Sequence, residues 1–160
     1  MSCTTIKTDG SLWGWGRARY GELPLNTGNN VHYSSPTQIG TDTNWSSVSQ
    51  GNAFGSAIKT DGTLWTWGQN SAGQLGVNDT TVRSSPIQIP GTDWSSSLAS
   101  AQHMAALKTD GSMRVWGKGG SGRLGLNGGA GGDNSYSSPT QLPGTWSMIG
   151  GWGLGGSGIK

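Results

Sequence analysis

A tetrapeptide recurs at regular intervals in this chain, and it limits the possible folds more than any other feature. Lys-Thr-Asp-Gly begins at Lys7, Lys59 and Lys108, so its copies are spaced by 52 and 49 residues. Two further markers keep the same phase: Ser-Ser-Pro, which ends at Pro36, Pro86 and Pro139, and Trp-Ser, which begins at Trp45, Trp94 and Trp146. Markers that stay in phase indicate a structural unit of about fifty residues, written three times.

Each unit is predicted to hold about four short β-strands. The Asp-Gly dipeptide is a strong hairpin signal, and residues 64–67 alternate large with small side chains, as a strand with one packed face does. One such sheet per forty to fifty residues is typical of a β-propeller blade. We therefore expect an all-β chain of three four-stranded antiparallel blades. Residues 1–160 form one domain, with units of approximately 1–50, 51–99 and 100–150 and a closing strand at 151–160.

The predicted core depends on tryptophan. The chain has nine tryptophans among 160 residues, and a buried aromatic side chain removes about 150 to 250 Å² from water. A tryptophan and a leucine recur at fixed places in the unit, which is the pattern of a repeated blade core. These expected core residues are Trp15, Trp67, Trp116, Leu23, Leu75 and Leu124.

Composition also excludes several classes of function. The formal net charge is +2 and no basic run is present, so we expect no binding of nucleic acid. No segment has the length and apolarity of a membrane span, so no membrane insertion is expected. Cys3 is the single cysteine, which excludes an internal disulfide and a metal site built on several thiolates. The compartment is left undetermined.

The repeated polar residues admit a chemical and a structural interpretation. A ring of carboxylates or of lysines could bind metal or anions, but an Asp before Gly usually stabilises a turn, and a Lys at a strand end is usually solvated. His32 and His103 fall at different places in the unit, and Gly128–Gly132 lacks the Lys-Ser or Lys-Thr of a phosphate loop. We therefore predict no catalytic residue, cofactor or metal, and assign the turns to Asp9, Gly10, Asp61, Gly62, Asp110 and Gly111.

Residues 61–76, and residues 102–111 followed by Trp116-Gly117, resemble the regulator-of-chromosome-condensation repeat. The resemblance implies a propeller, usually of seven blades, whose members act as binding scaffolds, as guanine-nucleotide exchange factors or as protein inhibitors of β-lactamases. The family's histidine is kept only at His103, and Arg114 replaces the tryptophan that the first two copies carry at Trp13 and Trp65.

Three blades do not close a ring, because propellers have about four to eight. Residues 155–160 keep the phase of residues 2–7, so these segments are two copies of one strand. We predict a six-bladed homodimer whose subunit junction includes Ile6, Trp152 and Ile159. The alternative is a piece of a longer gene product. For Trp152, stacking on a sugar is the alternative to packing at the junction.

The predicted function is a non-catalytic scaffold that binds a protein partner through its variable loops. These loops follow Gly16, Gly68 and Gly117 and surround Asn29, Thr80 and Asn134. A carbohydrate-binding propeller is the second hypothesis, because the chain is rich in Trp and Asn and poor in charge. Nucleotide-exchange activity is the third, implied by the resemblance alone.

Overall fold

The computed structural model describes residues 2–26, 31–126 and 134–150, together with the backbone of residues 157–159. The described residues form β-strands, and all of their pairings are antiparallel. The first sheet contains β1 (Ser2–Ile6), β2 (Leu12–Ala18) and β3 (Val31–Gln38). The second contains β4 (Trp45–Gln50), β5 (Phe54–Lys59), β6 (Leu64–Gly68) and β7 (Arg83–Ile89). The third contains β8 (Trp94–Ala99), β9 (His103–Lys108), β10 (Ser112–Lys118) and β11 (Ser135–Thr145).

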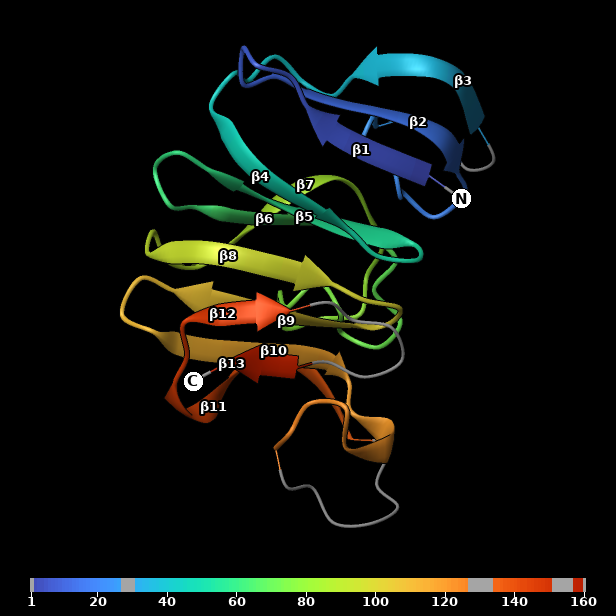
Figure 1. Cartoon of the computed structure of the whole chain (residues 1–160). Coiled ribbons are helices and arrows are strands. Elements are labelled where there is room, and N and C mark those ends of the chain that lie inside the picture. The colour runs from blue at the N-terminus through green and yellow to red at the C-terminus, as the bar shows by residue number, and fades with distance from the viewer. Residues whose placement is uncertain (1, 27–30, 127–133, 151–156, 160) are drawn as a thin grey trace.

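The sheets are stacked face to face, with β1–β3 at one end of the stack (Figure 1). Two further short strands, β12 (Met148–Gly150) and β13 (Ser157–Ile159), pair beside the third sheet. A short 3₁₀ turn, η1, spans Gly120–Gly122. The prediction of an all-β chain of antiparallel propeller blades is confirmed, with one correction: the first sheet has three strands and not four.

The position of the Trp-Ser marker explains that difference. In both four-stranded sheets the first strand, which we call the leading strand, begins at the marker tryptophan, Trp45 in β4 and Trp94 in β8. The hairpin and the outer strand follow it in the chain. Each of these sheets therefore crosses a boundary between predicted units, taking its leading strand from the end of the unit before. β12, which follows Trp146, has the same place in the repeat and begins a further sheet.

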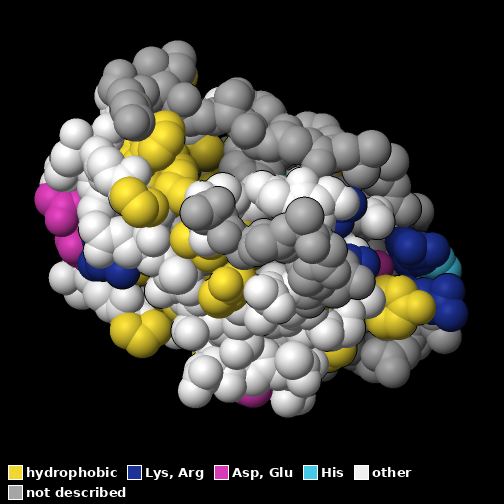
Figure 2. Space-filling model, turned by 90° about the horizontal axis from the view of Figure 1, so that it is seen from below, with side chains coloured by type: hydrophobic (Ala, Val, Ile, Leu, Met, Phe, Trp, Pro, Cys, Tyr) yellow, Lys and Arg dark blue, Asp and Glu magenta, His cyan; other side chains and the backbone are white. Residues whose placement is uncertain are grey.

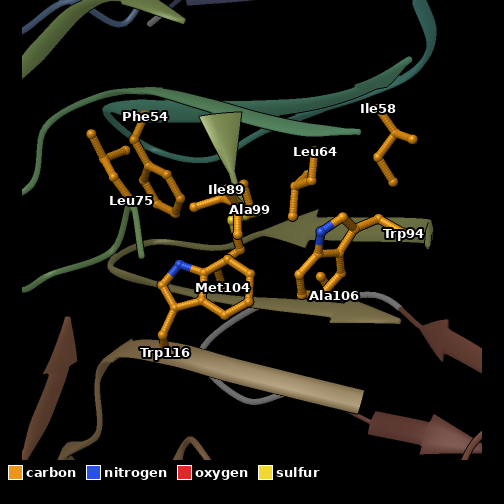
Figure 3. Close-up of a cluster of buried hydrophobic side chains, with 10 residues drawn as sticks. All are labelled: Phe54, Ile58, Leu64, Leu75, Ile89, Trp94, Ala99, Met104, Ala106 and Trp116. Atoms are coloured by element: carbon orange, nitrogen blue, oxygen red, sulfur yellow. The ribbon is translucent and has the colours of Figure 1, made fainter. Parts of the chain in front are cut away.

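The hydrophobic core lies between the sheets. Figure 3 shows one cluster, in which side chains of β5, β6 and β7 face those of β8, β9 and β10. A second cluster fills the space between the first two sheets, where Leu12 and Ile39 meet Trp45, Ala57 and Trp67. The stack is thus held by repeated contacts between neighbouring blades.

Two tryptophan indoles also join neighbouring blades through hydrogen bonds. Trp67 in β6 donates its Nε1–H to the carbonyl oxygen of Glu22, 3.1 Å away in the preceding blade. Trp116 in β10 does the same to the carbonyl oxygen of Gln74, at 2.9 Å. Each indole therefore buries its rings and still satisfies its polar hydrogen, which a buried Trp requires. In the part of the chain that the structure describes, no helix is long and apolar enough to cross a membrane.

Candidate binding clefts between the blades

The Asp-Gly turns lie at one end of the blades, which we call the turn face. Asp61 accepts hydrogen bonds from the backbone N–H and the hydroxyl of Thr63, at 3.0 and 2.7 Å, and these bonds hold the pKa of Asp61 below its usual 3.8. The Thr63 hydroxyl oxygen in turn accepts the indole N–H of Trp65 at 2.9 Å. The turn aspartates thus stabilise their turns and orient a neighbouring indole.

The same chain of hydrogen bonds recurs in the first blade and is shortened in the third. Asp9 accepts bonds from Ser11, whose hydroxyl oxygen accepts the indole N–H of Trp13 at 2.7 Å. Asp110 accepts the backbone N–H of Ser112 at 2.8 Å, but Arg114 stands where the other blades have a tryptophan. The turn face therefore differs chemically from blade to blade.

The repeated lysines bind both rings and carboxylates. The ammonium group of Lys59 lies 4.8 Å from the ring centroid of Trp45 and 4.6 Å from that of Trp65, and forms an ion pair of 2.7 Å with Asp42. Lys108 repeats this arrangement with Trp94 at 5.0 Å and with Asp93 at 3.0 Å. Lys7 lies 3.4 Å from the ring centroid of Trp13.

These two ion-paired lysines are mostly buried, with side-chain exposures of 12% for Lys59 and 19% for Lys108. They therefore form neither a free basic ring nor fully solvated strand ends, the two alternatives that the sequence left open. Each ammonium group is held by a neighbouring carboxylate and by the face of an indole ring. Sequence reasoning missed the partners Asp42 and Asp93, although Asp93 directly precedes a marker tryptophan.

A groove of about 490 Å³ opens between the first two blades, and we call it the tryptophan groove. Trp45 and Trp65 meet there edge to face, with ring centroids 6.2 Å apart. A smaller groove of about 230 Å³ has the equivalent position between the second and third blades, with Arg114 in place of Trp65. The tryptophan groove is lined by Pro24, Leu25, Asn26, Gln38, Ile39, Gly40, Asp42, Trp45, Trp65, Ser85 and Pro86.

The opposite end of the blades, the loop face, carries the connection 69–82 and the described residues 119–126, which follow the second strand of their hairpins. A polar hollow of about 310 Å³ lies there between the second and third blades. Among the lining residues that the structure describes, the charged side chains are the half-buried Lys118 and Arg123, and none is acidic. The polar hollow is lined by Asn52, Gln69, Ala101, Gln102, His103, Lys118 and Arg123.

His103 is buried at the base of this hollow, with 2% of its surface exposed. Burial, and to a smaller extent the charge of Arg123, lower the pKa of His103 from 6.5 to about 4. Because the neutral imidazole is the folded form, the unfolded chain binds more protons than the folded chain between these two values. The stability that the neutral His103 contributes is complete above pH 6.5 and is lost as the pH falls toward 4.

We expect His103→Phe, which installs the residue that the second blade has at this place, to flatten the melting temperature between pH 6.5 and 4. Thermal unfolding followed by circular dichroism at half-unit pH steps measures this slope. His32→Phe, the same substitution at an exposed histidine, is the matched control. An unchanged slope in His103→Phe would contradict the assignment. The turn aspartates act in another window, below pH 3.8, because their folded pKa values are lowered from 3.8.

The structure gives the predicted core residues unequal burial. Trp67 and Trp116 are fully buried, and Leu23, Leu75 and Leu124 are exposed by 3% or less. Trp15, expected at the equivalent place, is half-buried. The reason is its position: Trp67 and Trp116 each reach into a preceding blade, and no described residue forms a blade on that side of β1–β3.

The predicted junction residues are described only in part. Ile6 ends β1 and packs against the cluster between the first two blades. Trp152 lies outside the described residues, as does Asn29 of the predicted loops, and of Ile159 only the backbone in β13 is described. Cys3 is exposed in β1, and the described residues contain no cluster of three or more His, Cys, Asp or Glu side chains that could hold a metal ion.

Stacked antiparallel blades joined by repeated tryptophans define this chain as a β-propeller segment. Comparison with family models agrees: the regulator of chromosome condensation (RCC1) repeat matches residues 9–58 and 61–107, and a second model of that repeat matches residues 45–74. The chain belongs to the regulator of chromosome condensation repeat family.

Known proteins with related sequences are much longer than this chain. It is 30% identical over 89 residues to the probable E3 ubiquitin-protein ligase HERC3 of Homo sapiens, covering 54% of this chain and 8% of that protein. It is 34% identical over 86 residues to the regulator of chromosome condensation of Xenopus laevis, covering 54% and 20%. The chain thus spans a small part of the relatives it matches.

Solved structures show the same fold. Prp20p of Saccharomyces cerevisiae, described with its binding to Gsp1p and histones, superposes with a TM-score of 0.82 at 18% identity, over 99% of this chain and 42% of Prp20p. Human WBSCR16 superposes with a TM-score of 0.77 at 23% identity, over 92% and 39%. At these identities the likeness concerns the fold alone.

Proposed function

We propose that this chain is a non-catalytic scaffold that binds a protein partner through its loop face. The observation that carries the proposal is the polar hollow, where Lys118 and Arg123 present two cations beside amide side chains and none of the described lining residues is acidic. Family membership supports protein binding in general, without naming the partner. Exchange activity on a guanine-nucleotide-binding protein is a narrower form of the same proposal, and it is supported by family membership alone.

Side-chain bonds hold the loop beside the hollow in one conformation, which favours the binding of a partner. Asn70 donates its side-chain amide to the carbonyl oxygen of Asp79 at 2.9 Å and accepts the backbone N–H of Leu75 at 2.9 Å. Arg83 forms an ion pair with the carboxylate of Asp79. The connection 69–82 is therefore held by its own side chains, which reduces the entropy lost when a partner docks on it.

The positive charges of the hollow suit an acidic segment of the partner protein. Ammonium and guanidinium groups form their strongest hydrogen bonds with carboxylates, and Arg can bind a carboxylate through two parallel bonds. The side-chain amides of Asn52, Gln69 and Gln102 add neutral donors around the same space. A carboxylate that enters the hollow would meet hydrogen-bond donors from both charged side chains of the described lining.

A Glu-rich octapeptide titrated by calorimetry tests this function. We expect binding that weakens as salt is added, and a loss of about tenfold in affinity for Lys118→Glu and for Arg123→Glu, since one charged hydrogen bond contributes about 1.5 to 3 kcal/mol. Arg19→Glu makes the same change of charge on an exposed residue outside the hollow and should bind within about twofold of the parent chain. Equal affinities for all four chains would refute the proposal.

The tryptophan groove favours a second function, the binding of carbohydrate. Half-buried Trp65 and Gln38 line it beside the carboxylate of Asp42, and an indole with adjacent amide and carboxylate groups suits the face and hydroxyls of a sugar. Hits on a glycan array that disappear with Trp65→Ala would support this function. An array without hits would remove it and leave the protein-binding proposal intact.

We also propose that a second copy of the chain completes the propeller ring, as the in-phase repeat predicted. Among the described residues, the sheet β1–β3 has one strand fewer than the second and third sheets, and its Trp15 is half-buried.

A further inference from the structure

We infer that the polar hollow binds a phosphorylated side chain of the partner protein, with Lys118 and Arg123 holding its phosphoryl group. This inference deepens the proposed protein-binding function of the loop face and rests on it. It is also narrower than that proposal, because a partner that docks through carboxylates alone would satisfy the broader statement.

The two places that hold these cations recur in every blade with different charges. Lys118 follows the Trp-Gly pair of its blade, and Arg123 is the middle residue of the Gly-x-Leu sequence that comes next. The preceding blades have other residues at these places: Gln69 and Gln74 in the second blade, and Arg17 and Glu22 in the first. The second pair is uncharged, and the first compensates itself through an ion pair of 3.9 Å. The blade fold therefore does not require two cations there.

Neither cation has a carboxylate partner in the part of the chain that the structure describes. Lys59, by contrast, forms its ion pair of 2.7 Å with Asp42. Lys118 and Arg123 are half-buried, and both line the hollow. Partly buried charges are stabilised by an opposite charge close by, so an anion bound in the hollow would compensate both.

A phosphoryl group suits this charge better than a single carboxylate. It carries about −1.5 to −2 charges at pH 7 and has three strong acceptor oxygens, so that one group compensates two cations. Arg binds such oxygens through two parallel bonds, and Lys supplies a compact charge. The side-chain amides of Asn52, Gln69 and Gln102 offer further donors around the same space.

Lys and Arg side chains are also numerous on this side of the molecule. Figure 2 views the third-blade end of the stack, and it shows a larger group of them on the right, where the loop face lies in Figure 1, than on the left. Positive charge around a hollow raises the local concentration of anions and speeds their association. The surroundings of the hollow therefore favour the same ligand.

The Glu-rich octapeptide, prepared with serine, glutamate or phosphoserine at its fourth position, tests the inference. Calorimetry with the 160-residue chain at about pH 7.5 should give the phosphoserine peptide at least about tenfold higher affinity than the glutamate peptide, because one charged hydrogen bond is gained. Equal affinities of these two peptides would overturn the inference and leave the protein-binding proposal standing. If none of the three peptides bound, both would fall.

Substitutions that copy the second blade show which side chains hold the phosphoryl group. Lys118→Gln and Arg123→Gln install the residues that the fold accepts at Gln69 and Gln74. Each should weaken the phosphoserine peptide about tenfold and reduce its advantage over the glutamate peptide to about threefold. Arg19→Gln removes an exposed cation outside the hollow and should preserve both values. A full phosphoserine advantage in both hollow variants would contradict the inference.

The second ionisation of the phosphoryl group gives a signature that carboxylates lack. Its pKa is about 6, so lowering the pH from about 7.5 to about 5.5 should weaken the phosphoserine peptide about fourfold and leave the glutamate peptide unchanged. The charged and titratable side chains of the described lining are Lys118, Arg123 and His103. Lysine and arginine titrate far above this window, and the pKa of His103, lowered to about 4 by burial, keeps that imidazole neutral. Equal pH profiles for the two peptides would count against the phosphoryl contact.

A competition experiment separates a phosphorylated protein from nucleic acid as the source of the phosphate. Inorganic phosphate should displace the phosphoserine peptide, because it has the same charged oxygens. A thymidine oligonucleotide of eight residues, whose phosphates each carry one charge, should displace it less well than an equal concentration of unlabelled phosphoserine peptide. Better displacement by the oligonucleotide would overturn the inference and assign the hollow to nucleic acid.

Discussion

Replacing Trp116 by alanine should destabilise this protein more than any other single change of a side chain. Trp116 is fully buried, meets the ring of Trp94 edge to face at 6.3 Å, and donates its indole N–H to the carbonyl oxygen of Gln74 at 2.9 Å. A large cavity and an unpaired carbonyl would remain between the second and third blades. Trp→Ala changes in cores cost about 3 to 5 kcal/mol, a large share of the 5 to 15 kcal/mol that typically stabilises a domain.

Urea unfolding followed by circular dichroism measures this loss of free energy. Trp116→Phe should cost less, because the phenyl ring fills part of the cavity and only the indole N–H and the second ring are missing. Tyr20→Ala is the control, since Tyr20 is 36% exposed and its replacement should cost about 0.5 kcal/mol. A cost for Trp116→Ala no larger than that for Tyr20→Ala would show that the indole does not join the blades.

Gly62→Ala should produce the second large loss of stability. Gly62 has φ = 77° in the Asp-Gly turn, and a Cβ added there would overlap the carbonyl oxygen of Thr92, which belongs to the connection to the next blade. The left-handed backbone alone costs a non-glycine residue about 1 to 2 kcal/mol. Relieving the overlap shifts backbone, which adds about 1 to 3 kcal/mol.

Gly111→Ala separates these two terms. Gly111 has nearly the same dihedral, φ = 81°, but the nearest atom to its added Cβ is the carbonyl oxygen of Trp146 at 3.3 Å. It should therefore cost about 1 to 2 kcal/mol, the backbone term without the overlap. Thermal or urea unfolding of both variants gives the comparison. An equal loss of stability in the two variants would contradict the close approach of Gly62 to Thr92.

The repeated motif explains why much of this fold could be predicted from sequence. An Asp-Gly turn is a local structure, and the bonds from Ser11 and Thr63 to the preceding aspartates form within three residues. The burial of Trp67 and Trp116 could be predicted for another reason, since a large aromatic at a fixed place in every unit must meet the same neighbour in each blade. The first signal lies within a few neighbouring residues, and the second occurs in every unit, so both can be recognised in the sequence.

The candidate sites could not be predicted, because they join residues that are distant in sequence. The polar hollow brings Asn52 of the second blade beside Lys118 and Arg123 of the third. The ion pair of Lys59 with Asp42 depends on the path of the connection between two blades. The repeat pattern of the sequence does not predict that path. Trp15 was assigned to the core by its place in the repeat, but it is half-buried, and no described residue forms a blade on its side of the first sheet.

Hydrogen exchange at the indole N–H groups tests the central claim most directly, that each blade holds the one before it through a tryptophan. In ¹⁵N-labelled protein, the indole signals of Trp67 and Trp116 should be protected at every concentration, since their acceptors lie in the same chain. The half-buried indole of Trp15, for which no described blade supplies an acceptor, should exchange faster than either. Exchange of Trp67 and Trp116 as rapid as that of Trp15 would contradict the account.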